Sequence, residues 1–192
     1  MHRSTIADRS AIGYRHVCTV LPDAVVAPRP TVHVMAGYFF MLRDGVRYDA
    51  DQLTALLLRT RADAMPWLRS PHDEHSTRWW MEHVVLAEQH VRVAAAGTRL
   101  LGFTAVNGDW LEQLWVSPED QGRGVGRRLL VDAQQASGGH LALHVFTRNE
   151  RARQFYAATG FVLTSQSDGS GNEEREPDCT YAWSALPRSQ SQ

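Results

Sequence analysis

The chain has 192 residues, 43% of them hydrophobic, which is long enough to bury a substantial core and predicts one domain with one active site. Its 20 Lys and Arg residues against 21 Asp and Glu residues give a formal net charge of -1, which argues against nucleic acid as a partner. Its two cysteines, Cys18 and Cys179, fit neither a disulfide framework nor a structural zinc site, so a reducing cytoplasmic setting is expected.

The N-terminal region is apolar in places, but charged residues and prolines interrupt it. It therefore offers neither the roughly 20 unbroken apolar residues of a membrane helix nor the pattern of a secretory signal, and no membrane partner is predicted. We interpret residues 1–35 as a flexible extension, residues 36–186 as a single domain and residues 187–192 as a tail. Met35 and Met41, near the first convincing element, raise the hypothesis that translation starts after Met1.

Hydrophobic periodicity predicts strands and helices along the whole domain. In the first half we expect a strand at 38–42 with a backward extension into 31–34, a helix from about residue 50 that ends before Pro66, a helix from Asp73 or Ser76 to about Leu86, and an antiparallel meander of strands at 91–95, 100–106 and 110–116. In the second half we expect a glycine-rich loop at 121–126, a helix that stops at Gly138, a strand at 141–146, a helix at 150–158, a strand at 161–164, a long loop at 165–177 and a strand at 179–183. This order predicts an α/β fold with a mixed sheet covered by helices.

The glycine-rich loop is the strongest local signal, with the sequence Gln121-Gly122-Arg123-Gly124-Val125-Gly126-Arg127 between a predicted strand and a predicted helix. Glycines let backbone N–H groups converge on one point, and the helix adds its N-terminal donors and positive dipole, so a phosphate is the expected ligand. The spacing excludes the dinucleotide fingerprint, and no lysine is present for a nucleoside-triphosphate loop. The alternative is a turn that merely lets the helix pack.

Two motifs carry a resemblance to a known family. The first is Gln121-x-x-Gly124-x-Gly126, preceded by Leu114-Trp115-Val116-x-Pro118, which resembles the pyrophosphate loop of the GNAT (GCN5-related) N-acetyltransferases. The second is Asn149-x-x-Ala152-x-x-Phe155-Tyr156-x-x-x-Gly160-Phe161, which resembles the other half of their coenzyme A site. The segment Asn172-Glu173-Glu174-Arg175-Glu176-Pro177-Asp178 resembles a bacterial subgroup of undefined substrate. The resemblance covers about residues 38–183 and implies the acyl-CoA N-acyltransferase fold, a mixed, mostly antiparallel sheet with helices on both faces.

The resemblance implies that acetyl-CoA is the acyl donor and that its acetyl group passes directly to an amine, without a metal. The pantetheine arm would lie between the strands at 111–116 and 141–146. The residues that would bind the donor are Leu114, Trp115, Val116, Gln121, Gly122, Arg123, Gly124, Val125, Gly126, Arg127, Asn149 and Phe155. Tyr156 would protonate the leaving thiolate, since a tyrosine pKa of about 10 is near the thiol value of about 8.5. For Asn149, support of the helix start by a Thr147–Glu150 capping box is the alternative.

The amine must lose a proton before or during attack, because a free alkylamine has a pKa of about 10. Glu112, on the strand that borders the proposed thioester site, is the candidate base, and its alternative role is that of an exposed, solubilising carboxylate. His72, His75 and His144 compete for the role of base. A metal at His72 and His75 is not favoured, since no matching ligand set is present.

The acceptor site is less defined by the sequence. The resemblance puts Trp67, His72 and Trp79 near the acceptor, whereas core packing is the alternative for both tryptophans. Glu173 and Glu174 could face a cationic acceptor, although such acidic runs are more often solvated. The acceptor is predicted to be a small-molecule or peptide amine. A homodimer is common in the family, and a non-catalytic acyl-CoA-binding regulatory module is the alternative function.

Overall fold

The structure is a computed structural model that describes residues 31–35, 38–69 and 71–185 of the chain. Residues 1–30 of the expected extension and the expected tail at 187–192 lie outside the described residues. Residues 31–35, which the domain boundary above leaves in the extension, form a strand that pairs antiparallel with the next one, from Thr31 opposite Leu42 to Met35 opposite Tyr38, where extended structure at 31–34 was predicted. The described domain therefore starts before residue 36, because this pairing satisfies the backbone groups of the segment.

The secondary-structure elements follow the predicted order. The strands are β1 (Thr31–Met35), β2 (Tyr38–Asp44), β3 (His90–Ala96), β4 (Arg99–Asn107), β5 (Trp110–Val116), β6 (His140–Phe146), β7 (Val162–Ser167) and β8 (Asp178–Ser184). The α-helices are α1 (Ala50–Ala64), α2 (Glu74–Trp80), α3 (Leu86–Glu88), α4 (Val125–Ala136) and α5 (Glu150–Ala158). Shorter turns are the 3-10 helices η2 (Arg47–Asp49) and η4 (Pro118–Asp120) and the π-helical η3 (Met81–Val85).

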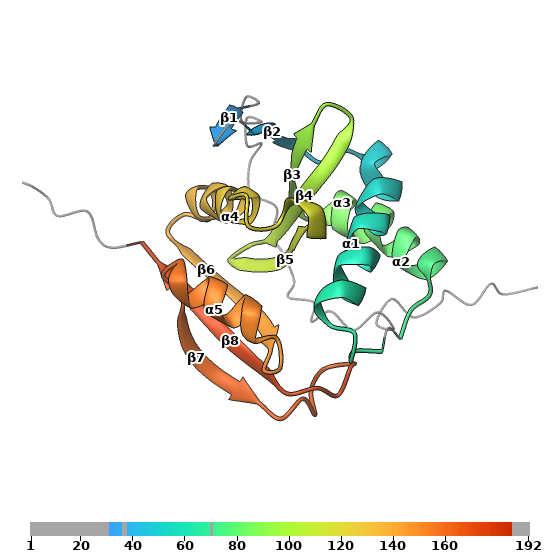
Figure 1. The fold of residues 1–192 in the computed structure, drawn as a ribbon. Coiled ribbons are helices and arrows are strands. Elements are labelled where there is room, and N and C mark those ends of the chain that lie inside the picture. Colours follow the sequence, from blue (N-terminus) through green and yellow to red (C-terminus); the bar gives the residue numbers. More distant parts are fainter. Residues whose placement is uncertain (1–30, 36–37, 70, 186–192) are drawn as a thin grey trace, which may run out of the picture.

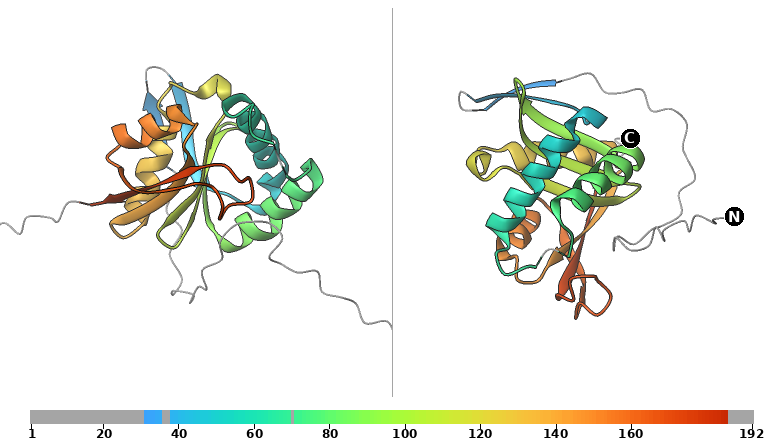
Figure 2. Two further views of the ribbon diagram at one scale, coloured as in Figure 1. Left: turned by 90° about the horizontal axis from the view of Figure 1, so that it is seen from below. Right: turned by 90° about the vertical axis from the view of Figure 1, so that its right-hand side faces the viewer.

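A single sheet organises the fold, with the strand order β1-β2-β3-β4-β5-β6-β8-β7. All neighbouring strands are antiparallel except β5 and β6, which are parallel. Helices α1 and α2 cover one face, and α4 and α5 cover the other (Figures 1 and 2). The predicted mixed, mostly antiparallel sheet with helices on both faces is confirmed.

The two faces of the sheet bury separate groups of apolar side chains. On one face, Leu53 and Leu57 of α1 pack with Phe103 of β4. On the other face, Leu129 and Leu130 of α4 are buried in the clusters that cover the sheet there. Burying each such side chain contributes roughly 1.5–3 kcal/mol. These apolar layers therefore fix the end of β5 relative to the start of α4.

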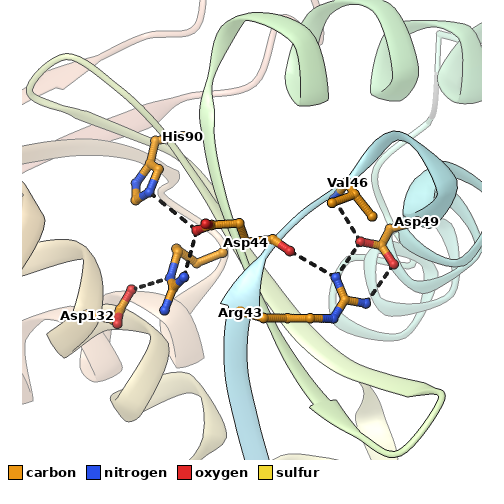
Figure 3. A network of polar contacts seen from close by, with 7 residues as sticks. Arg43, Asp44, Val46, Asp49, His90 and Asp132 are labelled. Carbon is orange, nitrogen blue, oxygen red and sulfur yellow. Dashed lines mark hydrogen bonds and ion pairs between the residues drawn. The ribbon is translucent and has the colours of Figure 1, made fainter. Parts of the chain in front are cut away.

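One fully buried cation lies on the α4 side of the sheet. Arg92 of β3 is 2% exposed and forms ion pairs with Asp44 of β2 at 2.6 Å and with Asp132 of α4 at 2.9 Å. Figure 3 shows Asp132 of the helix and Asp44 of the strand bonded to the same guanidinium between them, and His90 lies 3.9 Å from Asp44. Arg92 therefore ties α4 to the sheet, since a buried charge is tolerated only when it is paired.

Two element boundaries differ from the predictions. The second predicted helix continues to Glu88 because the π-helical turn Met81–Val85 joins α2 to α3 without a break. Strand β7 reaches Ser167, into the segment predicted to be a loop, because it is an edge strand whose side chains are all exposed and so needs no apolar alternation. Among the described helices, none combines the length and apolarity required to cross a bilayer.

Candidate active site

Strands β5 and β6 are paired at one position and then separate. Their parallel pairing contains one register position, Trp110 opposite Ala142, with the Ala142 amide donating to the Asp109 carbonyl at 2.8 Å. Beyond that point the strands diverge, as the separated β5 and β6 ribbons in Figures 1 and 2 show. The backbone of β5 after residue 110 thus pairs with β4 on one side and is not paired with β6 on the other. A strand edge of this kind can accept an extended ligand by backbone hydrogen bonds.

The glycine-rich loop connects the end of β5 to α4. Gly122 and Gly124 have φ angles of 75° and 83°, a region that favours glycine, and Gly124 is the N-cap of α4. The first turn of α4 contains no acidic residue and its cap supplies no side-chain hydrogen bond. Helical bonding starts with the Arg128 amide donating to the Gly124 carbonyl at 3.0 Å, so the amides of residues 125–127 precede the ladder.

These features fit a pyrophosphate, because amides without helical partners and the positive end of the α4 dipole meet where the chain carries Arg123 and Arg127. Gly126 lies next to both neighbouring elements, since an added Cβ would be in ordinary van der Waals contact with Val116 Cγ2 at 3.4 Å and with the Phe155 ring at 3.8 Å. The loop therefore packs closely against β5 and α5, the two elements that carry the predicted motifs.

Most side chains of the first motif contact other parts of the protein and stabilise the loop. The Gln121 carboxamide donates to the Val116 carbonyl at 2.9 Å, which closes the turn between β5 and α4. The Trp115 indole donates to Gln113 Oε1 at 2.6 Å and packs toward the α1 side of the core. Leu114 and Val116 pack on the α4 side. Any contact of residues 114–116 with a donor is accordingly expected from their backbone.

Glu112 lies just past the last paired position of β5 and β6. The β4–β5 register passes from Val106 opposite Leu111 to Ala105 opposite Gln113, so Glu112 is the extra residue of a β-bulge. Burial raises the pKa of the Glu112 carboxyl above its usual value, and it makes no ion pair with another described residue. A half-buried carboxylate with a raised pKa, on β5 just past its single paired position with β6, has the properties of a general base.

Tyr156 lies on α5, in the buried cluster that also contains Leu143 and Val145 of β6. Its ring makes edge-to-face contacts with Phe155 and Phe161, at centroid distances of 5.4 Å and 5.6 Å. Burial raises the pKa of Tyr156 well above 10, and its hydroxyl has no hydrogen bond to another described side chain or backbone group. The expected close match to a thiol pKa is thus weakened, and Tyr156 is suited to donate a hydrogen bond while it keeps its proton.

Asn149 is the N-cap of α5, and its side-chain oxygen accepts from the Ala152 amide at 3.1 Å. Asn149 therefore supports the start of the helix, which was the alternative to its ligand role, although it does so through its own side chain. The Thr147 hydroxyl instead lies 3.4 Å from the Cys179 sulfur, so the Thr147–Glu150 capping box is not formed. The cap orients Asn149 at the end of β6, beside the gap between β5 and β6.

Trp67 and His72, in the segment between α1 and α2, meet residues from the other half of the chain. The Trp67 ring is 6.0 Å from that of Phe146 at the end of β6, and the Arg148 guanidinium stacks over it at 4.4 Å. His72 is 3.1 Å from Glu173 in the β7–β8 loop. The rings of Trp67 and Phe146, called the aromatic wall below, thus join the α1–α2 segment to the end of β6, and the His72–Glu173 contact joins it to the β7–β8 loop.

The acidic β7–β8 loop is partly neutralised within the chain. Glu174 forms an ion pair with Arg61 of α1 at 3.1 Å, with both side chains less than a fifth exposed, and Glu173 contacts His72. The expectation that Glu173 and Glu174 face a cationic acceptor is weakened, because Glu174 is paired with Arg61 and Glu173 contacts His72, both in the α1–α2 region. The loop acts instead as a bridge to that region.

Trp79 is not brought into this arrangement. Its side chain is 47% exposed and stacks on His83 at a centroid distance of 4.9 Å, whereas the neighbouring Trp80 is buried in the core. Core packing, the alternative for Trp79, does not match this exposure, and its acceptor role stays a prediction. A residue that sequence reasoning left out is Trp110, which stacks on His144 at 4.7 Å beside the β5–β6 junction. Among the described residues, no group of three or more His, Cys, Asp or Glu side chains could hold a metal.

Comparison with known proteins gives a family match for part of the chain. Residues 80–163, which contain β5, the glycine-rich loop, α4 and α5, match the family described as acetyltransferase (GNAT) domain. This match over less than half of the chain supports N-acetyltransferase activity of the GNAT type.

Individual relatives are bacterial. The chain is 27% identical over 130 residues to the peptidyl-lysine N-acetyltransferase YiaC of Escherichia coli K12, covering 64% of this chain and 84% of that one. Its fold is similar to the solution structure of apo YjaB from Escherichia coli, with a TM-score of 0.64 and 24% identity over 77% of this chain and 99% of that one. It is also similar to YncA of Salmonella typhimurium with its cofactor acetyl-CoA, with a TM-score of 0.59 and 17% identity over 80% of this chain and 98% of that one.

Proposed function

We propose that this enzyme acetylates lysine side chains of peptides or proteins, with Glu112 as general base and Tyr156 as hydrogen-bond donor to the leaving sulfur. The observation that carries the catalytic part is the separation of β5 and β6, with Glu112 on β5 two residues past their single paired position and Tyr156 in the cluster that packs on both strands. The acceptor class is supported by the similarity to YiaC, whose name gives peptidyl-lysine as its substrate.

Acetyl-CoA supplies an acetyl group activated as a thioester. In the proposed arrangement, amides of residues 122–127 and the α4 N-terminus hold the pyrophosphate, and the unpaired edge of β5 aligns the pantetheine arm. A backbone amide at Leu114 or Val116 then donates to the carbonyl oxygen as it gains negative charge. The chain contributes position and fixed dipoles at this stage.

Proton movement is assigned to two side chains. Glu112 accepts the proton that the amine loses as its nitrogen forms the new bond to the acetyl carbon and the carbon–sulfur bond breaks. A raised carboxyl pKa makes Glu112 a stronger base than an exposed glutamate. Tyr156 donates a hydrogen bond to the departing sulfur and stays largely protonated, because its raised pKa exceeds that of a thiol.

The aromatic wall formed by Trp67 and Phe146 fits the acceptor part of the proposal. A lysine side chain presents a long apolar stem with an amine at its end, and aromatic rings bind such stems while leaving the amine accessible. Trp67 is partly exposed, and its edge-to-face contact with Phe146 and the stacked Arg148 hold it in place.

The test is mass spectrometry of a peptide library incubated with the enzyme and acetyl-CoA. Peptides with a blocked N-terminus and one central lysine report side-chain acetylation, and matched peptides with a free N-terminus and no lysine report the alternative site. We expect a mass gain of one acetyl group on the lysine set. If thiol is released with small amines alone, the acceptor is a small amine and not a lysine of a peptide or protein. If acetyl-CoA binds tightly but no amine causes thiol release, the non-catalytic module is favoured.

A further inference from the structure

A buried carboxylate directly precedes the glycine-rich loop. Asp120, the last residue of η4, is 1% exposed, and both of its carboxylate oxygens accept hydrogen bonds from the Arg99 guanidinium, at 2.7 Å and 3.0 Å. Arg99 is the first residue of β4, and its side chain is about half exposed. This bidentate pair joins the chain just before Gln121 to the β3–β4 hairpin, in the geometry that gives the strongest protein ion pairs.

The same hairpin holds the end of β5 by backbone contacts. The Ser117 amide donates to the Leu101 carbonyl at 2.8 Å. Gly102 leaves so little room that an added Cβ would lie 2.6 Å from the Trp115 carbonyl oxygen. The start of β4 therefore fixes residues 115–120, and the Arg99–Asp120 pair is the side-chain component of that support.

Asp120 also has an electrostatic consequence for the loop that follows it. A carboxylate beside an anion site disfavours phosphate binding unless its charge is balanced, and a buried carboxylate is screened little by solvent. Arg99 supplies the balancing charge while it holds Asp120 in one orientation. We propose that Arg99 and Asp120 are positioning residues of the donor site. Together they preorganise the phosphate loop, and Arg99 neutralises the charge of the Asp120 carboxylate that precedes it. The proposal rests on the donor-binding role given above to residues 122–127.

The first measurement is the Kd for CoA by calorimetry. Arg99→Met should raise it by about tenfold or more, since it removes two charged hydrogen bonds and leaves the Asp120 charge beside the loop. Asp120→Asn should raise it less, because no buried charge remains. Adding Asp120→Asn to Arg99→Met should lower the Kd from that of the single Arg99 variant. Arg99→Lys, which keeps the charge and loses the bidentate geometry, should lie between wild type and Arg99→Met.

A second readout separates positioning from general stability. Acetyl-pantetheine carries the thioester but no pyrophosphate, so its KM should be unchanged in the Arg99 variants while the KM for acetyl-CoA rises. The kcat at saturating acetyl-CoA should stay within about twofold of wild type, since the pair touches no reacting atom.

The chain offers a matched control in Arg43 and Asp49. Arg43 binds both oxygens of Asp49 at 2.7 Å and 2.8 Å, and Asp49 is 5% exposed (Figure 3). This pair lies at the start of α1. Asp49 is ten residues, or about 15 Å along the helix, from Arg59, the α1 residue that contacts Ser117 after β5, so the control pair is remote from the phosphate loop. Arg43→Met should leave the Kd for CoA unchanged.

Three results would overturn the proposal. They are an Arg99→Met variant that binds CoA as wild type does, an equal rise of KM for acetyl-pantetheine and acetyl-CoA, and an equal loss of CoA affinity in Arg43→Met. If wild-type protein binds acetyl-pantetheine but not CoA, the donor-binding role of residues 122–127 fails first, and the positioning role fails with it.

Discussion

Replacing Glu112 with glutamine tests the proposed base with two readouts that should move in opposite directions. Glutamine keeps the size of the side chain and removes its ability to accept a proton. General-base catalysis contributes about 10²–10⁴-fold to rate, so kcat for a lysine peptide should fall by roughly that factor in Glu112→Gln. The Kd for acetyl-CoA should not change, because the donor is held elsewhere.

The stability of the same variant follows from the pKa. Burial raises the pKa of Glu112 above the usual 4.5 without a compensating ion pair, so the folded protein holds this proton more tightly than the unfolded chain does. The free energy of unfolding should therefore fall as pH rises from about the usual Glu value through the raised one. Glu112→Gln removes this loss and should have a higher Tm than wild type at neutral pH, with a smaller difference at pH 4.

Steady-state kinetics from pH 5 to 9 and thermal melts at pH 4 and 7.5 measure both effects. In wild type, kcat should decline as pH falls through the raised pKa of Glu112, and this limb should be absent in the variant. Glu88→Gln, at the exposed end of α3, is the control and should alter neither readout. A Glu112→Gln enzyme with kcat within threefold of wild type would exclude the base assignment, whatever its Tm.

Three other substitutions test separate parts of the molecule. Tyr156→Phe should lower kcat by about 10²-fold, measured at saturating substrates, with little change in Tm because the ring contacts remain; an unchanged kcat would argue against its role at the sulfur. Arg92→Met should lower the free energy of unfolding in urea by about 2 kcal/mol, since it removes the charged hydrogen bonds to the partly exposed Asp44 and Asp132, and an unchanged free energy would contradict this. Gly102→Ala should cost about 1–3 kcal/mol in the same assay, as its Cβ would meet the Trp115 carbonyl; a stabilised variant would show that β4 and β5 can separate freely.

The glycine-rich loop could be recognised from sequence because its signal is local. Gly122 and Gly124 occupy backbone conformations that other residues avoid, and a helix follows at once, so the composition itself carries the geometry. The strands β3 to β6 were also predictable, since their apolar runs are bounded by turn residues.

The bulge at Glu112 could not be predicted in the same way. A bulge is defined by the partner strand, and nothing in the residues around Glu112 states that Leu111 and Gln113 face consecutive residues of β4. For the same reason, helical periodicity does not decide between Trp79 and Trp80. The choice depends on how α2 packs against α1 and the sheet, which buries Trp80 and leaves Trp79 at the surface.

The single paired position between β5 and β6 has a consequence for how the protein responds to its donor. Sheets usually complete their hydrogen bonding on folding. Here a seam between β5 and β6 stays unpaired inside the sheet, because the two strands are bonded to each other only at Trp110 and Ala142. An extended donor arm in that seam would act as a ninth strand and finish the ladder. The amide hydrogens of β5 that face β6 beyond residue 112, unlike those bonded to β4, should then exchange slowly only in the loaded protein, so that donor binding also completes the hydrogen bonding of the sheet.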